Sequence, residues 1–304
     1  MSLLTRRSAL KTAAAGLTTA LFTPVLGFSD TKPKLAFSTL GCPKWGMDTI
    51  LKTAVSAGYQ GVEFRGLQGE LDLTKCPEFS TTARAAETRD RFAQQGIRIC
   101  NLGSSTQLHH ADATKRTRNL DEARRFIDLA HTLNCPFVRV FPDQLPPDQP
   151  REKTLRLISE GLLELGTYAK GSSVTVLLES HGELTRSDLL YQILHAAEHP
   201  NVGLIWDIVN MWVDAQESSG VVYQKLRPYI RHVHVKDIRV VDGKHQYVLV
   251  GKGEAPLRAA IDTLKAGGYD GYYSFEWEKL WHPEIQEPEL AIPSFPTAMK
   301  TYFS

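Results

Sequence analysis

The chain of 304 residues contains few cysteines, which limits how its fold can be held together. The four stand far apart, at Cys42, Cys76, Cys100 and Cys135, and none belongs to a C-x-x-C pair. Closely spaced cysteines are the usual signature of structural zinc or of a redox-active dithiol. The sequence gives no reason to expect either feature. We therefore expect buried free thiols and no disulfide.

An excess of charge of one sign is also absent. The chain has 35 Lys and Arg residues and 34 Asp and Glu residues, for a formal net charge of +1. Without Arg6, Arg7 and Lys11 the counts become 32 and 34. A protein that binds nucleic acid normally has a basic face. The composition therefore argues against a nucleic-acid partner.

Residues 1–29 differ from the rest and are set aside from the fold. Residues 5–11, TRRSALK, resemble a twin-arginine export signal, with Ala9 where a bulky apolar residue is usual. The weakly apolar stretch Thr12–Phe28 follows, and no other stretch is long and apolar enough to cross a bilayer. We expect export to the periplasm or cell envelope of a bacterium. Because no clear A-x-A cleavage site follows, an uncleaved membrane anchor stays open as the alternative.

Apolar strand-like runs alternate with amphipathic helical runs over residues 30–304. The predicted strands are Lys34–Leu40, Gly61–Arg65, Ile97–Gly103, Phe137–Phe141, Val174–Ser180, Val202–Asp207, Ile230–Val235 and Gly271–Glu276. The predicted helices are Asp48–Gly58, Thr81–Gln95, Arg118–Leu133, Arg151–Tyr168, Ser187–Glu198, Gly220–Leu226, Pro256–Ala266 and Pro288–Tyr302. Eight strand–helix units with short connections predict an α/β fold of one domain, the (β/α)8 TIM barrel.

An open, doubly wound α/β sheet is the alternative architecture. Such a sheet normally carries a glycine-rich phosphate loop after an early strand. The first loop reads GCPKWG, which does not fit G-x-G-x-x-G. The barrel is therefore favoured.

Metal-ligating side chains end the last four predicted strands. Apolar runs lead into Glu179, Asp207, His234 and Glu276. Because TIM-barrel active sites lie at the carboxyl ends of the strands, these side chains would converge. A buried carboxylate there is costly unless a positive charge meets it. The set predicts a site for Mn²⁺, Mg²⁺ or Co²⁺, with Zn²⁺ compatible but less characteristic.

The segments LLES, IWD, HVHVKD and SFEWE occur in this order, with GCPKW and GVEFRG before them. From about residue 34 onward the chain thus resembles the xylose isomerase-like TIM barrels, a superfamily of sugar isomerases and epimerases. The resemblance implies a divalent metal held by Glu179, Asp207, His234 and Glu276. It also implies that Glu179 and Glu276 act as catalytic acid and base, moving a proton beside a carbonyl group.

Asn210 is where the chain departs from that pattern. Many family members read D-x-x-H after strand six, whereas this chain has Asn210 three residues after Asp207. An amide forms hydrogen bonds but takes up no proton near neutral pH. This puts standard epimerase behaviour in doubt.

Further side chains at the predicted strand ends are expected to bind substrate: Glu63, Arg65, Arg139, His181, Lys236 and Trp277. A buried ion pair is the alternative role for the two arginines and for Lys236, and a plain loop role is the alternative for His181. Trp206 is a further tryptophan that could line the site, with core packing as its alternative role. His232 shares the register of His234 and is interpreted as a core histidine. Glu278 shares the register of Glu276 and is its rival as a ligand.

The sequence thus predicts a metal-dependent enzyme that acts on a sugar or sugar derivative by carbonyl-assisted proton transfer. Export argues against phosphorylated sugars, which are mostly cytoplasmic. Isomerisation or epimerisation is the first expectation, and elimination or hydration of keto-glycosides is the second. A non-catalytic carbohydrate-binding barrel and a homo-oligomeric state stay open. A nuclease of the endonuclease-IV-like branch would need a larger, histidine-rich zinc cluster and a basic face, and the sequence indicates neither.

Overall fold

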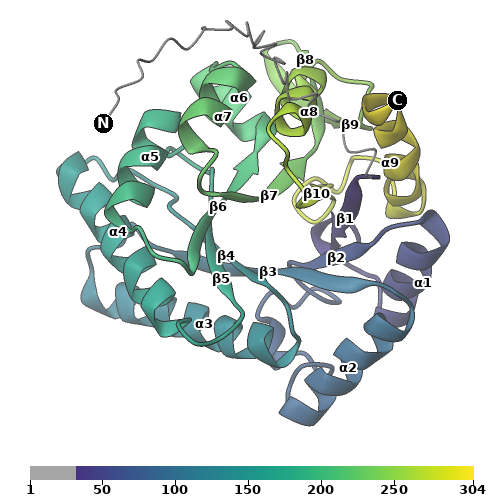
Figure 1. Cartoon of the computed structure of the whole chain (residues 1–304), viewed down its shortest axis with the longest axis horizontal. Helices are drawn as coiled ribbons and strands as arrows, with labels where there is room; N and C mark the ends of the chain where they lie inside the picture. Colours follow the sequence, from purple (N-terminus) through teal and green to yellow (C-terminus); the bar gives the residue numbers. More distant parts are fainter. Residues whose placement is uncertain (1–31) are drawn as a thin grey trace, which may run out of the picture. The chain divides into compact units, whose positions relative to one another are not determined.

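Eight parallel strands close into a barrel in the computed structural model, which describes residues 32–304 (Figure 1). They are β1 (Lys34–Ser38), β2 (Gly61–Phe64), β3 (Arg98–Gln107), β4 (Phe137–Phe141), β5 (Thr175–Glu179), β6 (Val202–Asp207), β7 (Ile230–Val235) and β10 (Tyr272–Phe275). Strand β1 pairs with both β2 and β10, which closes the ring. The predicted single-domain TIM barrel is confirmed. The predicted export signal lies outside the described residues.

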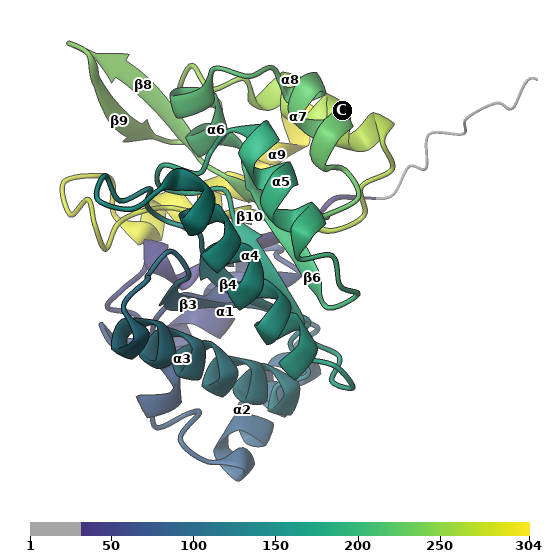
Figure 2. The same ribbon diagram turned by 90° about the vertical axis from the view of Figure 1, so that its left-hand side faces the viewer.

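Helices cover the outside of the barrel, and Figure 2 shows α3, α4 and α5 lying along its wall. The helices are α1 (Met47–Ala57), α2 (Thr82–Gln94), α3 (Ala113–Thr132), α4 (Arg151–Tyr168), α5 (Ser187–Ala196), α6 (Ile208–Ala215), α7 (Ser219–Leu226), α8 (Leu257–Ala266) and α9 (Pro288–Phe303). Among the described residues, no helix has the length and apolar character needed to cross a membrane. Helix α6 was not predicted, because it begins directly after β6 with no loop to mark its start.

Strand β6 shows why the apolar runs become barrel strands. All six residues of VGLIWD are buried, because a parallel strand is covered by side chains on one face and helices on the other. Trp206 is 1% exposed and belongs to this packing. The four cysteines are likewise buried and free, as expected.

A hairpin interrupts the regular alternation between β7 and α8. It consists of β8 (Asp237–Val241) and β9 (Lys244–Val248), which pair antiparallel and project away from the barrel (Figure 2). Asp242 and Gly243 join them with φ angles of 50° and 73°. Two successive positive φ angles are typical of a type I′ turn, for which Asp-Gly is a preferred pair. The Asp-Gly pair between two β-rich runs is the signal that the sequence prediction overlooked.

Asp237 fastens the base of this hairpin. Its Oδ1 accepts hydrogen bonds from the backbone N–H groups of Ile238 (3.0 Å) and Ala255 (3.2 Å). Its Oδ2 accepts from the backbone N–H groups of Gly251 and Gly253, both at 2.9 Å. A Cβ atom at position 253 would lie 2.1 Å from Oδ1, so only glycine fits there. One carboxylate therefore ties the loop after β9 to the rim of the barrel.

Candidate metal centre

The structure brings the four predicted metal ligands together at the carboxyl ends of their strands. Glu179 and Asp207 end β5 and β6, His234 lies near the end of β7, and Glu276 follows β10 directly. One ligand atom from each lies within 4.8 Å of the others, and all four residues are buried. His234 Nδ1 lies 3.1 Å from Glu179 Oε1 and 3.2 Å from Glu276 Oε1.

The partners of the two Asp207 carboxylate oxygens indicate whether the four-residue set suits a metal ion. Oδ1 accepts a hydrogen bond from the backbone N–H of Asn210 (2.8 Å), so Asp207 also caps α6. Oδ2 is buried and accepts no hydrogen bond from the described residues, although Lys236 Nζ lies 2.8 Å away. Burial raises the pKa of Asp207 to about 7; Lys236 opposes the shift, and Glu276 and Glu179 add to it. Burial and the neighbouring Glu276 and Glu179 thus outweigh the ammonium of Lys236 at this carboxylate. A hard divalent cation would stabilise its ionised form and fits this oxygen-rich set.

Arg139 holds Glu179. Its Nη1 donates to Glu179 Oε2 at 2.7 Å and its Nη2 to the backbone oxygen of Ser104 at 2.9 Å. The guanidinium also lies 3.8 Å over the ring of Phe141. Burial alone would raise the pKa of Glu179, but the charges of Arg139 and His234 outweigh it and lower the pKa. Glu179 is therefore ionised and fixed in orientation.

Lys236 holds Glu276. Its ammonium donates to Glu276 Oε2 at 2.8 Å and to Glu278 Oε1 at 2.7 Å. Burial would lower the pKa of Lys236, but Asp207, Glu276 and Glu278 raise it well above its usual value. The lysine stays charged. Glu278, the rival ligand, pairs with this ammonium and is not part of the four-residue set.

Glu63 lies behind His234. Its Oε2 accepts hydrogen bonds from His232 Nε2 (2.9 Å), His234 Nε2 (3.1 Å) and the hydroxyl of Ser274 (3.3 Å). Burial would raise the pKa of Glu63, but His234 and His232 lower it well below the usual value. An ionised carboxylate can only accept, so both Nε2 atoms carry the hydrogen. Glu63 thus orients His234 with its Nδ1 toward the other ligands. The contact of Glu63 with substrate stays a prediction.

His181 is paired with Asp143, a residue that sequence reasoning missed. His181 Nδ1 lies 3.2 Å from Asp143 Oδ1, and its side chain is 40% exposed. Gln107 donates to the other carboxylate oxygen at 2.6 Å. Burial lowers the pKa of His181, but the bond to Asp143 and the charge of Glu179 raise it overall. Asp143 follows β4 with φ of 73°, a loop conformation that no sequence pattern indicated.

Arg65, a predicted substrate-binding residue, has only some of its hydrogen-bond donors paired. Arg65 donates from Nη2 to Ser105 Oγ at 3.1 Å, while its buried Nη1 has no partner in the described part of the chain. Burial and the charge of Arg139 lower the pKa of Arg65 to about 9.

Trp277 is 1% exposed, stacks on Phe275 and donates from Nε1 to the backbone oxygen of Gln286 at 3.0 Å. Trp277 therefore packs in the hydrophobic core, and its contact with substrate stays a prediction.

Asn210 lies one helical turn beyond Asp207. Its Nδ2 donates to the backbone oxygen of Ser180 at 3.2 Å, so the amide links α6 to the residue that follows β5. The position where the D-x-x-H pattern would place a histidine therefore makes a hydrogen bond to the backbone in this chain.

Residues 51–293 match the family described as the Xylose isomerase-like TIM barrel, and the chain belongs to this family. It is 25% identical over 266 residues to fructoselysine 3-epimerase of Shigella flexneri, covering 84% of this chain and 93% of that protein. It is 26% identical over 231 residues to inosose dehydratase of Serratia proteamaculans, covering 66% and 73%. The crystal structure of the IOLI protein with a zinc atom has a TM-score of 0.72 at 19% identity, covering 89% and 98%. An epimerase and a dehydratase thus share this fold, and the comparisons leave the reaction type open.

Proposed function

We propose that the chain is a divalent-metal-dependent enzyme that moves a proton beside a carbonyl group of a non-phosphorylated sugar or sugar derivative. The observation that carries this proposal is the meeting of Glu179, Asp207, His234 and Glu276 within 4.8 Å. Epimerisation and dehydration can both begin with removal of a proton next to a carbonyl group. The similarity to an epimerase and to a dehydratase supports this shared first step.

The four residues would hold the ion. Three carboxylates and one imidazole suit Mn²⁺, Mg²⁺ or Co²⁺, and Zn²⁺ also accepts such a set. When bound, the ion supplies a Lewis acid that polarises the carbonyl group of the substrate.

Glu179 and Glu276 are the proposed acid and base pair. Arg139 and Lys236 fix their outer oxygens, and the same charges help to lower both pKa values against the effect of burial. An ionised carboxylate accepts the proton, and its partner or a water molecule returns one. Return to the opposite face gives epimerisation, and return to the neighbouring carbon gives isomerisation.

Elimination from a keto-glycoside or keto-sugar is the second candidate, and His181 favours it. The imidazole is partly exposed, and its bond to Asp143 raises its pKa. A protonated imidazole can donate to a departing hydroxyl or alkoxide oxygen. Asn210 cannot serve in this way, because an amide exchanges no proton near neutral pH.

The test combines metal analysis with turnover in D₂O. The purified protein is expected to contain a divalent metal and to convert a free ketose or a keto-glycoside with metal-dependent uptake of deuterium. Glu179→Gln should abolish turnover, while Glu160→Gln, an exposed change on α4, should leave it intact. Turnover by Glu179→Gln at the original rate would refute the catalytic role. Saturable sugar binding without turnover would identify a carbohydrate-binding barrel instead.

We further propose that the chain is exported in a folded state to the periplasm or cell envelope. The twin-arginine-like run at residues 5–11 supports this. A variant with Arg6→Lys and Arg7→Lys should remain in the cytoplasm when bacterial cells are fractionated. Export of this variant at the original level would contradict the proposal.

A further inference from the structure

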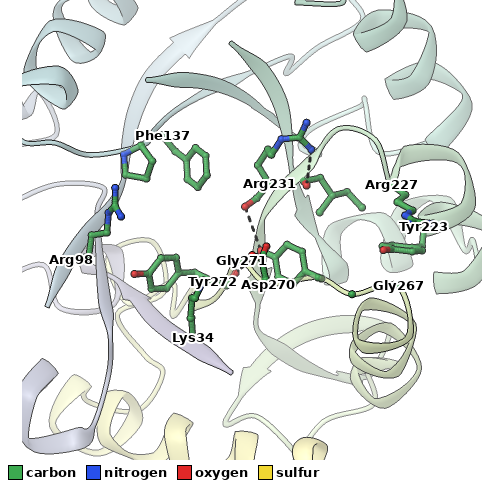
Figure 3. Close-up of a pocket in the computed structure, with 14 residues that line it drawn as sticks. Lys34, Arg98, Phe137, Tyr223, Arg227, Arg231, Gly267, Asp270, Gly271 and Tyr272 are labelled. Carbon is green, nitrogen blue, oxygen red and sulfur yellow. Dashed lines mark hydrogen bonds between the residues drawn. The ribbon is translucent and has the colours of Figure 1, made fainter. Parts of the chain in front are cut away.

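A hollow of about 520 Å³ opens at the amino-terminal end of the barrel (Figure 3). Its lining includes the first residues of five strands, which are Lys34, Arg98, Phe137, Ile230 and Tyr272. The candidate metal ligands lie at the other ends of the strands, so this hollow is separate from the mouth of the barrel. Its volume lies within the range of ordinary small-molecule pockets.

Positive charge dominates this hollow. It is lined by four cationic side chains and one carboxylate: Lys34, Arg98, Arg227, Arg231 and Asp270. Over residues 32–304, none of the four cations lies within 4 Å of a carboxylate oxygen. The chain as a whole is almost neutral, with a formal net charge of +1. Unpaired cations gathered around a concave surface attract anions more strongly than the same charges spread over a flat one.

Hydrogen bonds to the backbone hold two of the side chains that line the hollow, Arg231 and Tyr269. Arg231 donates from Nη1 to the backbone oxygens of Pro228 (2.8 Å) and Ile230 (3.1 Å). The hydroxyl of Tyr269 donates to the backbone oxygen of Tyr272 at 2.9 Å. Arg231 and the start of β10 are therefore held in place before any ligand arrives.

Aromatic rings complete the wall. Figure 3 shows Phe137 between Arg98 and Arg231, with the ring of Tyr272 across the hollow from it. Burial raises the pKa of Tyr272 to about 12, so its phenol keeps its hydrogen and can donate it. An anion in the hollow would thus meet guanidinium groups, a phenolic donor and an apolar surface for an organic part.

We propose that this hollow is a second ligand site that binds a small organic phosphate or a similar oxyanion with two or more negative charges. The guanidinium groups of Arg98, Arg227 and Arg231 are planar, and each can donate two parallel hydrogen bonds to two oxygens of one phosphate group. Phe137 and Tyr272 contact the organic part. This inference does not depend on the reaction at the other end of the barrel.

Isothermal titration calorimetry of the metal-free full chain tests the proposal, with phenyl phosphate and inorganic pyrophosphate as probes at constant ionic strength. We expect saturable binding of one molecule per chain. The double variant Arg98→Gln, Arg231→Gln should bind at least about tenfold more weakly, because two charge-assisted contacts are lost. The matched double variant Arg118→Gln, Arg151→Gln removes the same charge from exposed positions on α3 and α4. Its affinity should stay within about twofold.

Three outcomes would overturn the proposal. One is the absence of saturable binding by either probe. Another is an equal loss of affinity in both double variants, which would indicate diffuse electrostatic attraction. The third is loss of binding in Glu179→Gln, which would place the anion at the mouth of the barrel. Thermal melting of each variant verifies that it is folded.

Discussion

At the scale of single residues, the buried charges at the mouth are held in place by opposite charges. Arg139 fixes Glu179, Lys236 fixes Glu276, and Glu63 fixes His234. Such pairs cost desolvation energy, and removal of one partner leaves the other buried and uncompensated. The supporting residues can therefore be tested apart from the ligands themselves.

Lys236→Met is expected to destabilise the metal-free protein by about 3–5 kcal/mol, because it leaves three carboxylates beside one another without their cation. Urea unfolding with and without Mn²⁺ measures this effect, and added metal should restore part of the loss. Lys170→Met, an exposed change, serves as the control. Equal stability of the two variants would contradict the interpretation.

Glu63→Gln is expected to weaken metal binding by about 10–100-fold, because the amide holds the imidazole of His234 less firmly than the carboxylate. Competition with a fluorescent chelator gives the affinity. Glu87→Gln on the exposed side of α2 should leave it unchanged. An unchanged affinity in Glu63→Gln would mean that the orientation of His234 does not depend on this contact.

At the scale of elements, the hairpin of β8 and β9 depends on a single carboxylate at its base. Asn in place of Asp237 keeps one oxygen but turns an NH₂ group toward backbone N–H donors. Asp237→Asn should cost about 1–3 kcal/mol in the local opening of this segment. Hydrogen exchange should show faster exchange in the hairpin and in residues 251–255, with the barrel strands unaffected. Uniformly faster exchange would show that the carboxylate stabilises the whole fold.

At the scale of the whole molecule, metal should stabilise the folded chain more strongly as the pH rises. Burial raises the pKa of Asp207 from 3.8 to about 7 without metal. Because the folded pKa is raised, the metal-free protein loses stability as the pH rises through this range. Metal binding requires the ionised carboxylate, so it strengthens over the same range. The gain in melting temperature on adding Mn²⁺ should be larger at pH 8 than at pH 5.5, and the reverse order would contradict this assignment.

The barrel could be predicted from the sequence because parallel strands covered on both faces leave continuous apolar runs, as in residues 202–207. The convergence of the four predicted ligands could then be predicted as well, because the carboxyl ends of all the strands lie at the same end of a barrel. The pairings of Glu63 with His234 and of His181 with Asp143 did not follow. They depend on side-chain direction and on a loop with positive φ, which no periodicity records.

The position of the Trp277 side chain also depends on side-chain direction, which the sequence pattern did not reveal. Trp277 lies next to Glu276, and strand alternation sends neighbouring side chains to opposite faces. One of the pair faces the ligand set while the other packs on Phe275.

The four buried cysteines make the chain suitable for single-site labelling. Burial raises the pKa of Cys42, Cys76, Cys100 and Cys135, so their thiols react slowly with maleimides. A cysteine introduced at the exposed tip of the hairpin, as in Lys244→Cys, would react first. A fluorophore there would follow the motion of the hairpin while substrates are added, with no need to remove any native thiol.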